Sequence, residues 1–340
     1  MWFRYYRLRV RIKRQYQMLV VILFLYCYSL IHFTCIRLVE IQLLLYLDML
    51  KWFALVVILV ICAFGLNIFI TNTKASSDEI TILLTGDIML GRSVAGVSLK
   101  KNDLNYPFEK VANITNSPDV TIGNLENPFV ADCPPSSDGL KFCADPKMIS
   151  GLNYAGFDIV NLANNHMANY GIDGTTQTEN YLKNAGIDYV GIGNIVIKNI
   201  KGIKFGFIGF DFVDKKPSDT DYKLVKNSKN EVDILVVMVH WGIEYTSQPT
   251  NTQITIGRKL ISSGADVVAG SHPHWVQTTE YLTGKPIFYS LGNFVFDQPW
   301  SEETKKGLAV KLTYHSNKLS NVVSMPIYMN NFAQPEWINK

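Results

Sequence analysis

Residues 52–340, which we call the body of the sequence, have no surplus of basic residues. The chain shows no internal repeat or low-complexity tract. Residues 1–51 contain eight Lys or Arg and two acidic residues, a balance of +6 within an overall charge of +3 over 340 residues. This leaves −3 for residues 52–340, without the basic stripe that nucleic-acid binding requires. The composition argues against a nucleic-acid partner, and we interpret the N-terminal charge as the cytoplasmic flank of a membrane segment.

Cysteine is also scarce, which leaves one candidate disulfide outside the apolar stretches. The chain has five cysteines, of which Cys133 and Cys143 flank a loop, residues 134–139, rich in Pro, Ser and Gly. Two cysteines that bracket one loop predict a disulfide and an oxidising compartment. The alternative is a pair of reduced thiols in a cytoplasmic protein. The remaining three lie in apolar stretches and are expected to be inert: Cys27, Cys35 and Cys62.

Two apolar stretches, residues 18–36 and 52–70, approach the roughly 20 residues that a membrane-spanning helix needs. Residues 38–50 between them are apolar but interrupted by charged and polar side chains. Because the basic start favours a cytoplasmic N-terminus, one span would place the body outside the cytoplasm and two would return it. Met49 and Lys51 before an uncharged run are typical of a signal anchor, and we hypothesise that translation starts near Met49.

We therefore expect residues 1–51 to be a basic and apolar extension and residues 52–70 an uncleaved, single-pass anchor in the cell membrane. No lipobox precedes Cys62, and the apolar run is long for a cleaved signal peptide. Residues 71–79 would form a polar linker to an extracytoplasmic domain, residues 80–330.

From residue 79 onward, apolar runs of strand length alternate with helix-like stretches. Many runs are continuous and β-branched, which is typical of strands covered on both faces. The runs are residues 80–84, 120–122, 159–162, 189–192, 205–210, 234–239, 267–269 and 286–291, and the helix-like stretches include 146–155, 174–185 and 254–263. The alternation predicts an α/β domain. Residues 308–313 and 322–328 predict consecutive strands of a second sheet or an edge.

Side chains that can ligate metals follow several of these runs. Going along the chain they are Asp87, Glu126, Asn165 with His166, His240, and His272 with His274. Ligands of α/β sheets bind outside the carboxyl ends of the strands, and alternate residues of an extended segment, such as the last two histidines, share a side. Singly, each residue has an ordinary alternative as a turn residue, a surface acid or a core histidine. Together they predict a metal site.

Residues 80–326 resemble the poly-gamma-glutamate capsule synthesis (CapA-like) family of the calcineurin-like metallophosphoesterase superfamily. The matching stretches are Thr85-Gly86-Asp87-Ile88-Met89, Gly123-Asn124-Leu125-Glu126, Asn161-Leu162-Ala163-Asn164-Asn165-His166, His240-Trp241-Gly242, Gly270-Ser271-His272-Pro273-His274 and Ser290-Leu291-Gly292-Asn293-Phe294. The resemblance implies a four-layer α/β/β/α sandwich with metal ions at one edge.

The resemblance also implies a role for each site residue. The first metal would be held by Asp87 and His274, the second by Asn165, His240 and His272, and Glu126 would bridge them. His166 would be a proton donor or charge stabiliser, and Asn293 would lie near the site as a substrate-binding candidate. Arg92, close after the first aspartate, would contact an anionic substrate or else be a solvated surface arginine.

One position departs from the superfamily pattern, which places a histidine two residues after the first aspartate. Here that residue is Met89, and a thioether is a poor ligand for hard divalent metals. The first metal site is therefore leaner than the second, so one or two ions would bind. The mixed nitrogen and oxygen ligands suit Mn, Fe or Zn.

Two functions follow from these expectations. The first is a membrane-anchored, metal-dependent hydrolase of capsule or poly-gamma-glutamate synthesis, or a phosphodiesterase acting on another envelope polymer. The second is a non-catalytic, metal-dependent binder of the anionic polymer within an export complex. In both, the partners would be the membrane, an anionic envelope polymer such as poly-gamma-glutamate, and membrane proteins of capsule synthesis or export.

Overall fold

The structure is a computed structural model, and the chain divides into two units, Met1–Ser77 and Asp78–Lys340. The residues that it describes are 18, 20–30, 32, 37, 42–60, 79–134, 139–213, 215–331 and 333–338.

Among the described residues of the N-terminal unit, the helix Gln42–Val60, of 19 residues and mean hydropathy 2.3, is long and apolar enough to cross a membrane. A shorter apolar helix covers Val20–Leu30. The longer helix begins ten residues before the predicted anchor and continues through Asp48, which pairs with Lys51 one turn away at 3.1 Å. Glu79, the last residue of the predicted linker, already belongs to the first strand of the body. Residues 61–70, residues 71–78 of the linker, Cys35 and Cys62 lie outside the described residues.

The second unit, the body, begins with β1 and ends with β14. Its elements in chain order are β1 (Glu79–Ile88), α2 (Arg92–Lys101), η1 (Tyr106–Phe108), α3 (Ala112–Thr115), β2 (Val120–Leu125), η2 (Pro146–Met148), α4 (Ile149–Tyr154), β3 (Ile159–Asn161), η3 (Met167–Tyr170), α5 (Gly171–Ala185), β4 (Asp188–Val190), β5 (Val196–Ile200), β6 (Ile203–Asp211), α6 (Asp219–Glu231), β7 (Ile234–His240), α7 (Asn251–Ser263), β8 (Val267–Ser271), β9 (Thr279–Leu282), β10 (Lys285–Phe288), β11 (Asn293–Val295), β12 (Lys306–His315), β13 (Lys318–Asn331) and β14 (Gln334–Trp337).

Two mixed sheets form the centre of the body. The first has the order β14-β13-β12-β1-β2-β3-β4, with β11 also paired to β1, and the second has the order β5-β6-β7-β8-β10-β9. The eight predicted runs up to residue 291 all contain or overlap strands, and the three predicted helices overlap α4, α5 and α7, of which α5 and α7 each begin three residues earlier than predicted. The runs at 308–313 and 322–328 lie in β12 and β13, which extend the first sheet toward its β14 edge, so of the two alternatives the edge is confirmed. Strand β12 is antiparallel to β1, and β13 is antiparallel to β12.

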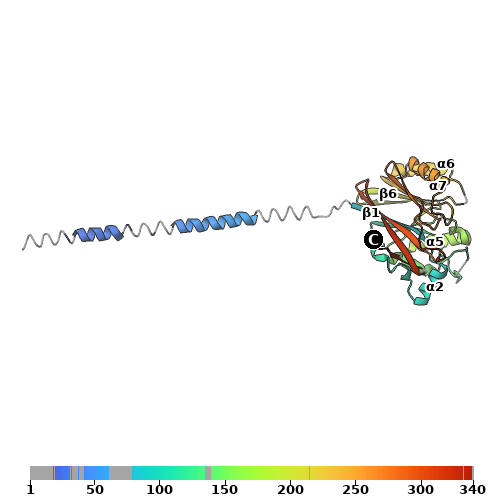
Figure 1. The fold of residues 1–340 in the computed structure, drawn as a ribbon, viewed down its shortest axis with the longest axis horizontal. Coiled ribbons are helices and arrows are strands. Elements are labelled where there is room, and N and C mark those ends of the chain that lie inside the picture. Colours follow the sequence, from blue (N-terminus) through green and yellow to red (C-terminus); the bar gives the residue numbers. More distant parts are fainter. Residues whose placement is uncertain are drawn as a thin grey trace, which may run out of the picture. The chain divides into compact units, whose positions relative to one another are not determined.

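Three apolar clusters give the body its four layers. Leu83 of β1 packs toward α2, α4 and α5, while its neighbours Ile82 and Leu84 pack between the two sheets. Likewise Val236 of β7 lies between the sheets and Val237 lies under α6 and α7. Strands buried on both faces explain the continuous apolar runs in the sequence. Figure 1 shows α6 and α7 on one side of the body and α2 on the other, which confirms the α/β/β/α sandwich.

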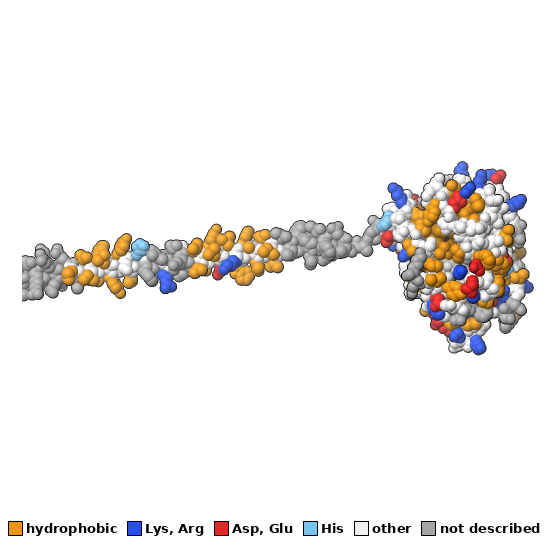
Figure 2. Space-filling model, in the orientation of Figure 1, with side chains coloured by type: hydrophobic (Ala, Val, Ile, Leu, Met, Phe, Trp, Pro, Cys, Tyr) orange, Lys and Arg blue, Asp and Glu red, His pale blue; other side chains and the backbone are white. Residues whose placement is uncertain are grey.

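Parallel pairing brings the predicted site residues to one edge of the body. Strands β1, β2 and β3 run parallel in the first sheet, and β7 and β8 run parallel in the second. Their carboxyl ends therefore carry the polar segments that follow each strand. On the face of the body shown in Figure 2, Lys and Arg side chains are scattered among acidic ones rather than gathered into a stripe.

Candidate metal centre

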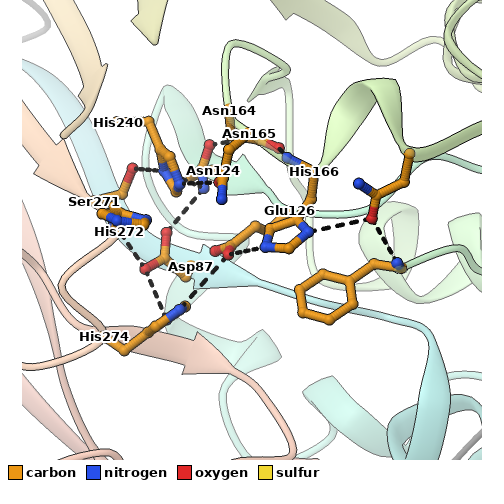
Figure 3. A network of polar contacts seen from close by, with 12 residues as sticks. Asp87, Asn124, Glu126, Asn164, Asn165, His166, His240, Ser271, His272 and His274 are labelled. Atoms are coloured by element: carbon orange, nitrogen blue, oxygen red, sulfur yellow. Dashed lines mark hydrogen bonds and ion pairs between the residues drawn. The ribbon is translucent and has the colours of Figure 1, made fainter. Parts of the chain in front are cut away.

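Six side chains predicted as metal ligands come together at these strand ends (Figure 3). They are Asp87 at the end of β1, Glu126 after β2, Asn165 after β3, His240 at the end of β7, and His272 and His274 after β8. We call Asp87, Glu126 and His274 the carboxylate set, and Asn165, His240 and His272 the imidazole set.

The ligand atoms of the carboxylate set converge within 4.8 Å of one another, and all three side chains are buried. His274 Nε2 lies 3.7 Å from Glu126 Oε1, and His274 Nδ1 lies 3.4 Å from Asp87 Oδ2. Neither carboxylate oxygen of Glu126 has a hydrogen-bond partner. Buried polar atoms without partners are costly and uncommon, and here they point toward two other ligands. This set fits a divalent ion.

Burial raises the pKa of the Glu126 carboxyl well above its usual value, and the neighbouring Asp87 carboxylate raises it further. Two carboxylates that share a dry site cannot both ionise at low cost. A bound divalent cation would offset this repulsion and favour the ionised form of Glu126.

Asn293 sets the direction of the His274 imidazole. The Nδ2 group of Asn293 donates to Gln298 Oε1 at 3.0 Å and to the Thr304 carbonyl at 2.9 Å, so Oδ1 is the atom that faces His274 Nδ1, at 2.9 Å. His274 therefore carries its proton on Nδ1 and leaves the Nε2 lone pair toward Glu126. Asn293, expected near the site as a substrate contact, is fully buried and orients the His274 ring.

The imidazole set lies beside the carboxylate set. His240 Nε2 is 2.9 Å from Asn165 Oδ1, and the rings of His240 and His272 have centroids 4.8 Å apart. Burial, followed by the neighbouring His274, lowers the pKa of His272 to about 4, and burial also holds the pKa of His240 well below its usual value. Both rings are therefore neutral at pH 7. His272 Nδ1 is buried without a hydrogen-bond partner.

Asn124 joins the two sets, and sequence reasoning did not single it out as a site residue. It lies in register with Asp87 on one side and Asn161 on the other. Its Nδ2 donates to Asp87 Oδ1 at 2.8 Å and lies 3.2 Å from His240 Nδ1. Its Oδ1 accepts from Asn161 at 2.9 Å and Asn164 at 3.3 Å.

Two signals in the sequence could have identified further site residues. Asn124 stands two positions before Glu126, so an extended chain places both on one side. Ser271, next to His272, is also a missed contact, since its Oγ lies 2.8 Å from His240 Nδ1.

His166 lies at the border of the carboxylate set. Its Nε2 is 3.8 Å from Glu126 Oε1, and its ring stacks on Phe142 with centroids 3.9 Å apart and planes 19° apart. Asn169 Oδ1, which accepts from the Phe142 N–H at 2.6 Å, lies 3.2 Å from His166 Nδ1. Burial lowers the pKa of His166, and a neutral ring can accept or pass a proton near pH 7.

Arg92 is held inside the body, so the alternative of a solvated surface arginine is wrong. Its side chain is 8% exposed and forms an ion pair with Asp297. It donates to the Gly139 carbonyl at 2.7 Å and lies 4.5 Å above the centre of the Phe142 ring. A contact between Arg92 and a substrate stays a prediction.

Met89 belongs to the core and does not replace a metal ligand. It is fully buried in the cluster beneath α2, and its sulfur accepts from the Gly91 N–H at 3.1 Å. The carboxylate set therefore has three protein ligands within the described residues.

Cys133 and Cys143 form a disulfide with Cα atoms 5.9 Å apart. Cys143 directly follows Phe142, so the bond lies next to the ring that covers His166. The oxidising compartment that this pair indicates stays a prediction.

An aromatic rim lies beside His274. Tyr245 contacts His274 with centroids 6.0 Å apart, and Trp300, 59% exposed, packs edge-on against Tyr245 at 6.2 Å. Tyr245, His272 and His274 all have positive φ (58°, 94° and 57°). Such conformations cost free energy in non-glycine residues and often accompany functional sites.

Comparison with known proteins identifies relatives of the body. The profile of the family described as bacterial capsule synthesis protein PGA_cap matches residues 81–298. The chain is 31% identical to the capsule biosynthesis protein CapA of Bacillus anthracis, over 74% of this chain and 68% of that protein. It is 31% identical to the PGA biosynthesis protein CapA of Bacillus subtilis (strain 168), over 72% and 69%. A crystal structure described as a novel phosphatase from Mycoplasma pneumoniae aligns with a TM-score of 0.47 at 13% identity, over 74% and 94%.

Proposed function

Since this chain belongs to the bacterial capsule synthesis protein PGA_cap family, we propose that it is a membrane-anchored, metal-dependent protein of capsule polymer synthesis or export. Support comes from relatives whose names include capsule biosynthesis and PGA biosynthesis. The anionic polymer that such relatives suggest is poly-gamma-glutamate.

The observation that carries the proposal is the carboxylate set. Glu126 offers two buried oxygens without hydrogen-bond partners, next to a second carboxylate and an imidazole whose lone pair is already directed. Mixed oxygen and nitrogen ligands of this kind suit Mn, Fe or Zn. Asn165, His240 and His272 are the further ligands that we propose if a second ion binds.

The first candidate activity is hydrolysis of a phosphate-bearing polymer or its precursor. A bound divalent ion would supply Lewis-acid polarisation of the substrate and a more acidic water. His166 would hold or donate a proton at Nε2, which faces Glu126 at 3.8 Å. Phe142 and Asn169 keep this imidazole in place from one face and one edge.

The second candidate activity is metal-dependent binding of the polymer without turnover. Its dependence on a metal follows from the charge of the site, because Arg92, a cation close to these residues, is already neutralised by Asp297. The carboxylate set adds negative charge. A polyanion would therefore be repelled unless a metal ion reverses the local charge.

An assay of the full-length protein in detergent micelles distinguishes the two. Phosphodiester turnover and poly-gamma-glutamate binding would be measured with Mn²⁺ and with EDTA, for the native protein and Asp87→Asn. Turnover that needs Mn²⁺ and falls at least about 100-fold in Asp87→Asn supports the hydrolase. Polymer binding that needs Mn²⁺ without turnover supports the binder. Metal-independent behaviour in both assays contradicts the proposal.

We also propose that the helix Gln42–Val60 is part of a single-pass anchor, with the body outside the cytoplasm. The length and mean hydropathy of this helix support the anchor. The disulfide between Cys133 and Cys143 supports an oxidising location for the body.

A further inference from the structure

We propose that Asn124 limits this site to one divalent ion, held by the carboxylate set, because its amide N–H group occupies the position between the two ligand sets. This inference rests on the proposed metal-dependent function and concerns how many ions the site holds. Figure 3 shows Asn124 between His240 and Asp87, with a contact to each.

The direction of the Asn124 amide is set by its neighbours. Asn161 uses Oδ1 to accept from the Ala163 N–H, so its Nδ2 donates to Asn124 Oδ1. Asn164 Nδ2 also donates to the Leu125 carbonyl at 2.8 Å and to Asn124 Oδ1 at 3.3 Å. With two donors on its oxygen, Asn124 must direct its NH₂ group toward Asp87 and His240.

On the side of the carboxylate set, this NH₂ group occupies one oxygen of Asp87. Asp87 Oδ1 accepts from Asn124 Nδ2 at 2.8 Å, while Oδ2 lies 3.4 Å from His274 Nδ1. Oδ2 also accepts from the His272 N–H at 3.2 Å. Oδ2 is therefore the oxygen that an ion beside His274 and Glu126 would take, while Oδ1, the oxygen that faces Asn124, is engaged by the amide.

On the side of the imidazole set, the same NH₂ group selects a tautomer of His240. Nδ1 of this ring is 2.8 Å from Ser271 Oγ, which can donate or accept, and 3.2 Å from Asn124 Nδ2, which can only donate, so Nδ1 accepts. The ring proton is then on Nε2 and is donated to Asn165 Oδ1 at 2.9 Å. A protonated Nε2 has no lone pair for a metal, so the imidazole set is closed as a three-ligand site.

Electrostatic repulsion between two metal ions also favours a single ion at this site. Two divalent ions in one site lie about 3.5–4 Å apart, and their repulsion is normally reduced by an anionic group between them. An amide NH₂ group carries a partial positive charge and cannot ligate. An aspartate at this position would keep the size of the side chain, accept a hydrogen bond from His240 Nδ1–H, and place an anionic oxygen between the two ligand sets.

Metal content of the full-length protein in detergent micelles tests this inference. The protein would be saturated with Mn²⁺ and desalted, and Mn would be counted by mass spectrometry and examined by electron paramagnetic resonance. We expect one Mn²⁺ per native chain with an uncoupled six-line spectrum. We expect two per chain in Asn124→Asp, with the broadened spectrum of a coupled pair.

Asn127→Asp serves as the control, because it changes another fully buried asparagine three residues along the chain. The side chain of Asn127 accepts from the Leu90 N–H and donates to the Pro128 carbonyl rather than to a member of either ligand set, so one ion is expected.

The outcomes distinguish this inference from the proposed function. Two ions in the native protein would overturn the inference and leave a metal-dependent site. Asn124→Asp folded with one ion would also overturn it. A native protein that binds no Mn²⁺ would overturn the proposed function as well.

Discussion

The imidazoles of this site receive their direction from side-chain amides and a hydroxyl. Asn293 faces His274, Asn169 faces His166, and Ser271 and Asn124 face His240. When the ring nitrogen that does not bind the metal is held by such a partner, the imidazole is already oriented before the metal binds. Removing such a partner typically weakens metal affinity by about 10- to 100-fold.

This gives a prediction for Asn293→Ala. The His274 ring would lose the partner of its Nδ1–H, so the dissociation constant for Mn²⁺ should rise by about 10- to 100-fold, as measured by isothermal titration calorimetry. Asn199→Ala, at an exposed position of strand β5, is the control and should bind as the native protein does. Equal affinity in Asn293→Ala would show that the amide does not orient the ligand.

A second prediction concerns pH. Burial raises the pKa of Glu126, so the carboxyl keeps its proton further up the pH scale than an exposed glutamate with a pKa of about 4.3. A metal ion must displace this proton, and affinity for Mn²⁺ should fall as the pH drops from 8 toward 5.5. Calorimetry in two buffers of different ionisation enthalpy should show proton release on binding. Affinity that does not vary over this range would contradict the assignment of Glu126 as a ligand.

At the scale of elements, the strand ends were predictable and the contacts between distant segments were not. The positions of Asp87, Glu126 and His240 follow from apolar runs that end locally, and parallel strands bring such ends to one edge. Arg92 was unclear from the sequence because its partner, Asp297, is 205 residues away. The helix Gln42–Val60 begins earlier than expected, and within it Asp48, which looks disruptive in sequence, pairs with Lys51 one turn away.

Because contacts between distant segments cannot be read from the sequence, parts of the site and of the sheet order were missed. Asn124 looks like an ordinary strand residue, and only the register of β1, β2 and β3 reveals that it lies between the ligand sets. The strands β12 and β13 have the pattern of a hairpin, which does not indicate which sheet they extend. In the structure β12 pairs with β1.

The disulfide-closed segment gives a prediction at this scale. Cys133→Ser with Cys143→Ser removes a bond between residues ten apart in sequence, and should lower the free energy of unfolding by about 2–3 kcal/mol. Denaturant unfolding followed by fluorescence measures this. Cys27→Ser, which removes a free cysteine of the N-terminal unit, is the control. Unchanged stability would show that the bond does not constrain the unfolded chain.

At the scale of the whole molecule, an anchor and an extracytoplasmic body predict a defined topology. Protease added to intact protoplasts should remove the body, residues 79–338, and leave the cytoplasmic flank protected. Immunoblotting with tags at the two ends would follow both fragments, and a cytoplasmic protein serves as the control for lysis. Protection of the body until the membrane is permeabilised would place it in the cytoplasm and contradict the proposed localisation.

The most direct test of the metal site is crystallography of the protein grown with Mn²⁺, with diffraction recorded at the manganese absorption edge. The account predicts an anomalous peak bounded by Asp87, Glu126 and His274, where three ligand atoms already converge within 4.8 Å. The peak should be absent in crystals of Glu126→Gln. A map without a peak at these residues, or with manganese only elsewhere, would contradict the central claim that this cluster is a metal site.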